Sequence, residues 1–212
     1  MDEALSKREL NKAKKKELII NTAERLFVEK DFVSTSMDEI AYAAGLTKRT
    51  VYKYFINKED LFYAIIRRGA QLLNTYFEEA FNKGNNALEK IHLANEAYLQ
   101  FYTGNQNIFR LWTYMPSNKK NYEASINFCE AEKIRSNIAM RYIQIIEDGK
   151  ADGSINKDLN TKQVVFFLLF SSTGYLNTIA LLDKVFWDMQ EIDEDSFIKF
   201  GLELFTDVLK SP

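Results

Sequence analysis

One short stretch of the chain concentrates side chains that bind anions. The segment GLTKRTVYKYFINK, residues 45–58, contains four cationic side chains and no acidic one, with aromatic residues between them. Ammonium and guanidinium groups donate hydrogen bonds to phosphate and to the edges of nucleobases. The whole chain has 28 Lys and Arg against 30 Asp and Glu, so this positive charge is local. The segment therefore predicts contact with a nucleic acid.

The elements that position this segment are predicted to be helices. Apolar residues recur three and four apart over 12–30 and again over 37–44, which is the helical period. Ser36 stands where a cap belongs, and Glu39 follows three residues later, so the pair predicts a capping box at the start of the second helix. Asn57 is predicted to cap a longer fourth helix.

A glycine turn is predicted between the second helix and a third. Gly45 can adopt the left-handed conformation that ends a helix, and Thr47 can cap a short helix over 48–54. Val51 and Phe55 are four residues apart and are expected to face the core. The cationic and hydroxyl-bearing residues of this third helix must then project outward.

An outward cationic helix suits the major groove of DNA, where Lys and Arg contact guanine and a Thr methyl contacts thymine. Residues at its end and at the start of the second helix can hold phosphates, which fix the position of the protein on the duplex. The candidate DNA-contacting residues are Thr35, Ser36, Thr47, Lys48, Arg49, Thr50, Tyr52, Lys53, Tyr54 and Lys58. The alternative is a solvated charged helix beside a packed turn.

A second basic run lies upstream and begins in what is expected to be a flexible arm over about 1–11. The run consists of Lys7, Arg8, Lys12, Lys14, Lys15 and Lys16. These cations either add contacts to the DNA backbone or only solvate the chain, and the sequence alone favours solvation.

The spacing over residues 18–62 resembles the DNA-binding domain of the TetR family of bacterial transcriptional regulators. The matching residues are Ala23, Leu26, Phe27, Phe32, Thr35, Ser36, Ile40, Ala41, the segment AGLTKRTVYKYF, Lys58, Glu59 and Leu61. Asp31 stands where the family usually has glycine, a change that Asp tolerates because it enters left-handed conformations. Arg49 occupies a position that often holds a small residue, so the bases contacted here are expected to differ.

This resemblance implies a division of labour along the chain. Residues 1–57 would form a three-helix helix-turn-helix DNA-binding domain, with 47–54 as the recognition helix and Lys58 as a phosphate anchor. A fourth helix would join it to a larger helical domain over 58–212 that binds an effector and dimerises.

The predicted fold class is all-α, because strand-type alternation is nearly absent. Beyond the fourth helix, the apolar spacing and the intervening glycine, proline and asparagine residues predict five further helices. These helices are expected over 86–103, 105–115, 119–149, 161–184 and 194–209.

The helix over 161–184 contains the run VVFFLLF at 164–170, which is apolar all the way round. Such a helix must be covered on every side, and a partner subunit is the natural cover. We therefore expect a homodimer through 161–184 and 194–209. The alternative is a monomer in which the run is central core.

Aromatic residues are dense in the larger half of the chain. The candidates for an effector pocket are Phe101, Phe109, Trp112, Tyr142, Phe167, Phe170 and Tyr175. Aromatic walls with a few polar tips suit a small apolar or aromatic effector. The same side chains equally make an ordinary core, which is the favoured interpretation at each single position.

Several classes of function are disfavoured by the composition. The single cysteine and single histidine supply no zinc site, and no nucleophile with an orienting base stands out, so neither an enzyme nor a cofactor is expected. No apolar run approaches the length that spans a bilayer. We expect a cytoplasmic protein.

The functional hypothesis is a ligand-responsive transcriptional regulator, a repressor that binds a pseudo-palindromic operator in double-stranded DNA as a dimer. One alternative is an architectural or cell-cycle DNA-binding protein without a small-molecule effector. Another is an enzyme or carrier built on an aromatic helical pocket.

Overall fold

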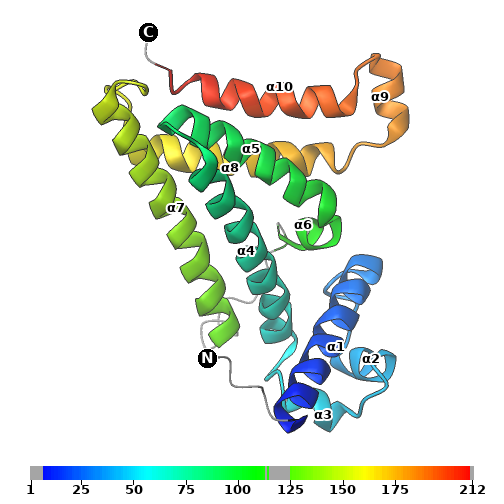
Figure 1. The fold of residues 1–212 in the computed structure, drawn as a ribbon. Coiled ribbons are helices and arrows are strands. Elements are labelled where there is room, and N and C mark those ends of the chain that lie inside the picture. Colours follow the sequence, from blue (N-terminus) through cyan, green and yellow to red (C-terminus); the bar gives the residue numbers. More distant parts are fainter. Residues whose placement is uncertain (1–6, 113, 115–124, 211–212) are drawn as a thin grey trace. The chain divides into compact units, whose positions relative to one another are not determined.

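The structure is a computed structural model that describes residues 7–112, 114 and 125–210, and within these ranges it contains only helices and no strand (Figure 1). The helices are α1 (Lys7–Lys30), α2 (Met37–Ala43), α3 (Lys48–Tyr52), α4 (Lys58–Lys83), α5 (Ala87–Gly104), α6 (Gln106–Trp112), α7 (Ile126–Asp152), α8 (Thr161–Ile179), α9 (Lys184–Gln190) and α10 (Glu194–Asp207). The predicted all-α fold is confirmed.

The chain divides into two compact units. The first, which we call the head unit, comprises Met1–Gly69 and Arg110–Glu132, and the second, the body unit, comprises Ala70–Phe109 and Lys133–Pro212. The head unit therefore contains more of the chain than the expected 1–57. It also includes the first part of α4 and the segment that leads into α7.

The core of the head unit forms where the apolar stripes of its helices meet. Ile19 and Phe27 of α1, Ile40 of α2 and Val51 of α3 are each at most 2% exposed. Phe62 of α4 closes this core, with its ring centroid 6.1 Å from that of Phe27. Burying each such side chain stabilises the fold by roughly 1.5–3 kcal/mol, so this core holds α3 against α1 and α2.

A buried carboxylate explains why the segment before α7 belongs to the head unit. Asp60 is 6% exposed and accepts hydrogen bonds from Ser125 Oγ at 2.7 Å and Asn127 Nδ2 at 2.9 Å. Its other oxygen accepts from the backbone N–H of Ile56 at 3.2 Å. One side chain thus joins the turn between α3 and α4 to the start of α7.

Three predicted boundaries are wrong. Residues 7–11 belong to α1 and are not a flexible arm, whereas residues 1–6 lie outside the described part of the chain. The helix expected over 161–184 ends at Ile179, and α9, which was not predicted, begins after the cap Asp183. The helix expected over 119–149 begins at Ile126, because Ser125 before it is not helical; residues 119–124 lie outside the described part of the chain.

The body unit packs α5 and α8 against α10. On α8, Val165 and Leu168 face inward at 0% and 6% exposure, while Phe167 and Phe170 face outward at 48% and 71%. Both sides of the helix are therefore apolar, as the sequence predicted.

No single helix in the described ranges is long and apolar enough to cross a membrane. The pair α8 and α9 passes that test together, but it is bent by 96°.

Candidate nucleic-acid interface

The turn between α2 and α3 has the predicted chemistry. Gly45 has a φ of +65°, the left-handed region that a side chain disfavours. The backbone N–H of Gly45 donates to the carbonyl of Tyr42 at 3.0 Å, and that of Leu46 donates to Ala41 at 2.9 Å. Thr47 then caps α3, because its Oγ1 accepts from the N–H of Thr50 at 3.2 Å. A tight turn therefore sets the angle between the two helices.

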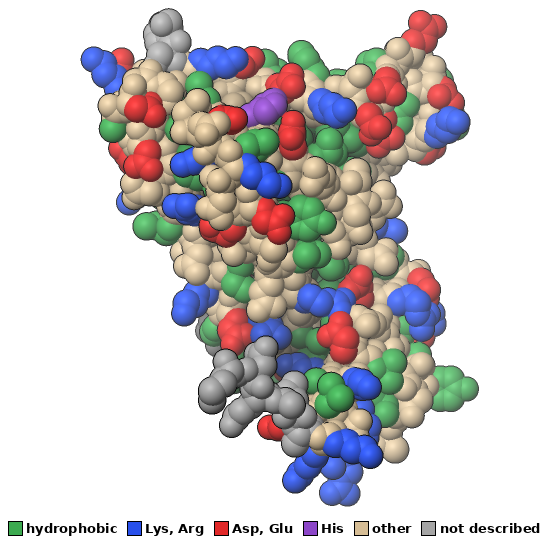
Figure 2. Space-filling model, in the orientation of Figure 1, with side chains coloured by type: hydrophobic (Ala, Val, Ile, Leu, Met, Phe, Trp, Pro, Cys, Tyr) green, Lys and Arg blue, Asp and Glu red, His purple; other side chains and the backbone are tan. Residues whose placement is uncertain are grey.

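Helix α3 separates its side chains as the sequence predicted. Val51 is fully buried and Phe55, just beyond the helix, is 1% exposed. The side chains that lie outside are exposed or half-buried, and they are Thr47, Lys48, Arg49, Thr50, Tyr52, Lys53 and Tyr54. Figure 2 shows Lys and Arg side chains gathered at the end of the head unit where Figure 1 places α3 and the beginning of α1.

The cations of α3 differ in whether an acid neutralises them. Lys48 Nζ lies 2.7 Å from a carboxylate oxygen of Asp38, the second residue of α2, and this hydrogen bond raises the pKa of Lys48. Arg49 and Lys53 are exposed and make no ion pair within the described part of the chain. Asp38 was not foreseen as a partner, although its place in the first turn of α2 was a usable signal.

The turn between α1 and α2 engages one of the predicted contact residues, Thr35, within the chain. Asp31 has a φ of +70°, so it does adopt the left-handed conformation, and its carboxylate accepts from the N–H and Oγ of Ser34. These bonds lower the pKa of Asp31. Thr35 is 1% exposed and donates its hydroxyl to the carbonyl of Asp31 at 2.7 Å. The hydroxyl hydrogen of Thr35 is therefore used within the chain, and its phosphate contact stays a prediction.

Ser36 is exposed at the start of α2 and acts as its cap. Its Oγ accepts from the N–H of Glu39 at 3.2 Å, which is one half of the predicted capping box. The carboxylate of Glu39 pairs instead with Lys30 of α1, and this hydrogen bond lowers the pKa of Glu39. An open groove of about 430 Å³ beside this turn is lined by Ser36, Lys48 and other head residues.

Lys58, the residue that resembles the family's phosphate anchor, is engaged within the chain. Its Nζ donates to the carbonyls of Phe32 at 2.6 Å, Thr35 at 2.7 Å and Val33 at 3.2 Å. It also lies 4.4 Å from the centroid of the Phe32 ring. An ammonium group has three donors, so its donor capacity is used. Burial lowers the pKa of Lys58. Its phosphate contact stays a prediction.

The residues predicted to line an effector pocket do not form one group. Phe101, Phe109 and Tyr142 are buried in the body unit, and burial raises the pKa of Tyr142. Trp112 packs against the head core, and Phe167 and Phe170 are exposed on α8.

Tyr175 is half-buried, and its hydroxyl donates to the carbonyl of Phe197 at 2.5 Å. A groove of about 390 Å³ between α4 and α5 is lined by Tyr76, Glu79 and other residues, and none of the predicted effector residues is among them. The effector pocket at the seven aromatic residues stays a prediction.

Comparisons with known proteins agree with the geometry of the head unit. Residues 19–65 match the profile of the bacterial regulatory proteins of the tetR family. The chain is 30% identical over 149 residues to the Transposon Tn10 TetC protein of Escherichia coli, covering 69% of this chain and 66% of that protein. It is 27% identical over 93 residues to the HTH-type transcriptional activator FasR of Mycolicibacterium smegmatis, covering 44% and 42%. The chain thus aligns with less than two thirds of the length of either relative.

Solved structures show the same fold over nearly the whole chain. A bacterial regulatory protein in the tetR family from Rhodococcus RHA1 superimposes with a TM-score of 0.73 at 19% identity, covering 94% of this chain and 98% of that one. The regulator FadR from Bacillus subtilis, in complex with stearoyl-CoA, has a TM-score of 0.70 at 21% identity, covering 91% and 98%. These likenesses show the fold, whereas the matched profile over residues 19–65 and the 30% identity to the TetC protein show the family. The chain belongs to the TetR family of bacterial transcriptional regulators.

Proposed function

We propose that the chain is a ligand-responsive repressor that binds a pseudo-palindromic operator in double-stranded DNA as a homodimer in the cytoplasm. The observation that carries this proposal is the division of α3 into a buried side, at Val51, and an exposed cationic side. A helix fits the major groove of B-DNA, where an arginine can donate two hydrogen bonds to one guanine. Arg49 and Lys53 are the candidates for base contact, because no ion pair in the described ranges neutralises them.

The dimer is proposed to form through the outward faces of α8 and α10. Phe170 of α8 is 71% exposed, and Phe200 and Leu204 of α10 are 60% and 52% exposed. Gly174, one turn after Phe170, has open space where a Cβ would stand, so a partner helix can approach closely. In a homodimer this arrangement gives a four-helix interface and two recognition helices. An operator with half-sites about one helical turn, ~34 Å, apart would match such a pair.

The effector is proposed to be a small apolar or aromatic molecule that binds the body unit. In support, the body unit contains a buried aromatic cluster with polar tips. The ring centroids of Tyr98 and Phe109 lie 6.0 Å apart, and the Tyr98 hydroxyl lies 2.9 Å from Thr173 Oγ1. By linkage, an effector weakens DNA binding by the same factor by which DNA weakens effector binding, about 5–150-fold in typical cases. The first alternative, an architectural or cell-cycle protein, lacks this coupling.

Selection of bound duplexes from a random pool tests the DNA-binding part. We expect the wild type to enrich one pseudo-palindrome, and Arg49→Ala to enrich a relaxed set because a base contact is lost, with a cost of about 1–3 kcal/mol on the original site. Lys133→Ala, an exposed substitution on α7, is the matched control and should enrich the wild-type sequence. Equal enrichment by all three proteins would reject the assignment of Arg49.

Two further measurements test repression and the effector. Expression of a reporter gene behind the selected operator should rise when the regulator is deleted. A fall in expression would indicate activation, as the name of FasR states for that relative. Native mass spectrometry of the purified protein should detect a co-purifying small molecule, which operator DNA should displace. The architectural alternative would be favoured if the body unit retains no ligand and if cell extract does not change the affinity of the protein for the operator.

A further inference from the structure

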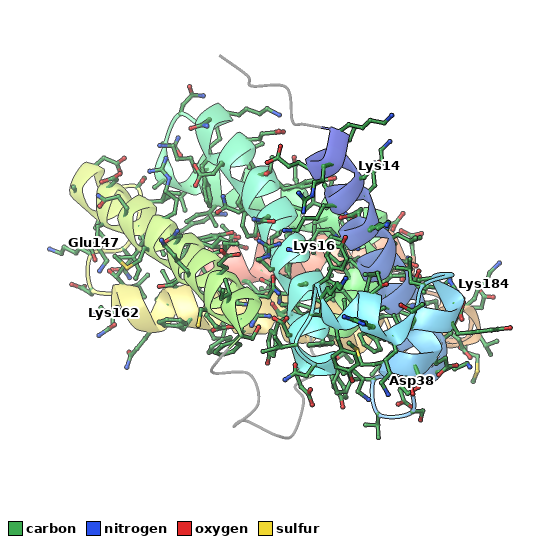
Figure 3. The ribbon with its side chains drawn as sticks, turned by 90° about the horizontal axis from the view of Figure 1, so that it is seen from below. Lys14, Lys16, Asp38, Glu147, Lys162 and Lys184 are labelled. Carbon is green, nitrogen blue, oxygen red and sulfur yellow. The ribbon has the colours of Figure 1, made fainter. Side chains whose placement is uncertain are left out.

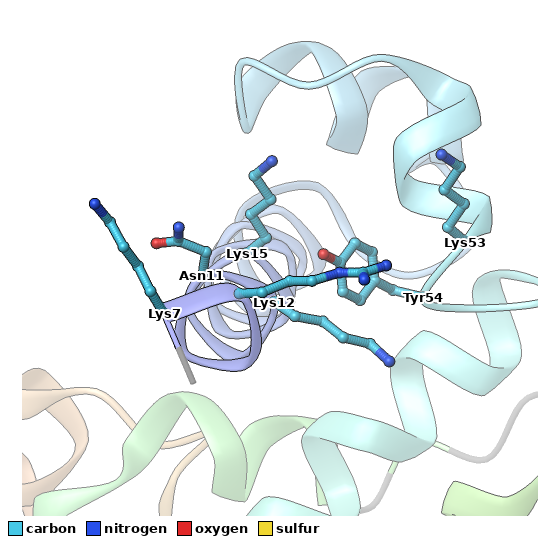
Figure 4. Close-up of a pocket in the computed structure, with 7 residues that line it drawn as sticks. Lys7, Asn11, Lys12, Lys15, Lys53 and Tyr54 are labelled. Carbon is cyan, nitrogen blue, oxygen red and sulfur yellow. The ribbon is translucent and has the colours of Figure 1, made fainter. Parts of the chain in front are cut away.

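The first turns of α1 line an open groove with the end of the recognition helix. The groove has a volume of about 750 Å³, and the residues that line it are Lys7, Arg8, Asn11, Lys12, Lys15, Lys53 and Tyr54. Five of these seven are cations, and none of the described lining residues is acidic. Figure 4 shows the α1 side chains on one side of the groove and Lys53 and Tyr54 on the other.

The helical state of residues 7–15 fixes these cations in place. Lys7, Asn11 and Lys15 are four residues apart, and Arg8 and Lys12 repeat that spacing one position later, so all five share one face of α1. From residue 7 to residue 15 a helix rises about 12 Å. A flexible arm would lose conformational entropy on binding, whereas a preformed helix has already lost it.

Helix α1 is also held beside the recognition helix. The Nζ of Lys16 lies 5.9 Å from the centroid of the Phe55 ring, directly after α3, and Phe55 is 1% exposed. Farther along α1, Ile19 and Phe27 are buried in the core that contains Val51. The groove and α3 therefore belong to one packed unit, and a duplex that receives α3 would bring its backbone to the groove.

The charge of the groove suits a polyanion. Like charges in a concave site raise the local concentration of counter-ions, and duplex DNA carries one negative charge per roughly 1.7 Å of axis. Lys and Arg, together with the amide of Asn11 and the hydroxyl of Tyr54, are the donors that proteins use toward phosphate oxygens. The extended row of cations matches consecutive phosphates better than it matches a single small anion.

We propose that this surface, which we call the α1 groove, binds the phosphodiester backbone that flanks the bases contacted by α3. This inference rests on the proposed function, because it presupposes that α3 enters a DNA groove. For the four members of the upstream basic run that line the groove, it reverses the expectation from sequence that the run only solvates the chain; these members are Lys7, Arg8, Lys12 and Lys15. The α1 groove adds affinity and salt dependence without adding sequence preference.

The test compares two double variants that remove the same charge. Lys12→Gln with Lys15→Gln removes two cations of the α1 groove, and Lys14→Gln with Lys157→Gln removes two exposed cations outside it. Figure 3 shows Lys14 projecting outward from α1. Glutamine has nearly the helix propensity of lysine, so we expect the melting temperatures to stay close to that of the wild type. Dissociation constants are measured from 50 to 200 mM salt on the selected operator and on a random duplex.

Removal of two phosphate contacts should reduce the slope of log K against log salt by about 1.8. Between 50 and 200 mM salt, the wild type should then lose about 12-fold more affinity than the groove variant, on both duplexes alike. The control should keep the wild-type slope. Hydroxyl-radical footprints of the groove variant should also be shorter at their outer edges.

The outcomes separate the inference from the proposed function. If the wild type binds duplex and the groove variant keeps the slope of the control, the α1 groove is only a solvated face and the inference is overturned. A slope lost on the operator but kept on the random duplex would overturn it too, because it would indicate base contacts. If the wild type binds neither duplex at 50 mM salt, the proposed function fails and the inference fails with it.

Discussion

Lys58→Met distinguishes two roles for a lysine at the start of α4. The resemblance to TetR-family regulators implies that Lys58 holds a DNA phosphate. In the structure its ammonium group donates to three carbonyls of the segment between α1 and α2, at 2.6, 2.7 and 3.2 Å, and lies over the Phe32 ring. We predict that Lys58 chiefly stabilises the packing of α4 against the turn between α1 and α2. Methionine keeps the length of the side chain and removes the charge.

The size of the effect follows from the groups that are lost. A hydrogen bond to a charged group contributes roughly 1.5–3 kcal/mol, so three of them would be worth more than any single substitution usually costs. Two terms reduce the sum. The ammonium is partly desolvated, as the lowered pKa of Lys58 shows, and methionine does not bear that cost. Water can also reach carbonyls near exposed residues such as Val33.

We therefore expect Lys58→Met to lower the free energy of unfolding by about 2 kcal/mol, or the melting temperature by about 4–8 °C. Thermal unfolding followed by circular dichroism measures it. Lys53→Met is the matched control, since Lys53 is exposed, and its change should stay within about 0.5 kcal/mol. Lys58→Arg should restore only part of the stability, because a planar guanidinium cannot converge on three carbonyls in the same way.

DNA binding supplies the result that would refute this reasoning. If Lys58 only stabilises the packing of α4 against the turn, the folded Lys58→Met protein keeps the wild-type salt dependence of DNA affinity. If Lys58 is a phosphate anchor, the slope of log K against log salt falls by about 0.9 and the melting temperature does not change. The second pattern would show that the carbonyl contacts of the free chain are exchanged for phosphate at no cost to stability.

Four other predictions address separate parts of the chain. Asp60→Ala should lower the free energy of unfolding in urea by about 2–3 kcal/mol, because three donors lose their acceptor, and Asp60→Asn should lose less. Asp31→Ala should lower the melting temperature more than Asp31→Gly, since glycine accepts a φ of +70° without strain. Because the pKa of Asp31 is lowered, its contribution to the free energy of unfolding is present above about pH 4 and is lost as the pH falls through the lowered value. Asp31→Asn should abolish this pH dependence. Phe170→Glu should convert a dimer to a monomer in sedimentation experiments, whereas a monomeric wild type would contradict the proposed interface. Burial raises the pKa of Tyr98 to about 12, so its contribution to stability should be complete below about pH 10 and be lost between pH 10 and 12, in contrast to Tyr98→Phe.

Features with a local chemical cause could be predicted from the sequence. Gly45 and Asp31 both adopt positive φ, and Ser36 and Thr47 both cap the helices that they precede. Each outcome depends on a residue and its neighbours within four positions. The buried side of α3 was predictable for the same reason, because the spacing of Val51 and Phe55 is a property of one helix.

Features that depend on distant partners could not be predicted. Thr35 and Lys58 have the residue types of phosphate ligands, but carbonyls of the α1–α2 segment accept their hydrogen bonds. Phe101 and Phe170 are the same residue type, and only the packing of the body unit buries the first and exposes the second. No glycine or proline marks the end of α8 in the apolar sequence before α9, so the break between the two helices and the cap at Asp183 were not predicted.

The pairing of charges determines which cations the head unit can offer to DNA. The chain has a formal net charge of −2, and within its described part ion pairs neutralise several of the basic side chains. Arg25, Lys30, Lys48 and Arg68 each pair with an acid within the head unit. Their positive charge is already balanced, so exchanging an acid for a phosphate gains little. The cations that line the α1 groove have no acid among the described lining residues, and they adjoin α3. Salt dependence should therefore map to this small set of side chains, although the sequence contains many more cations.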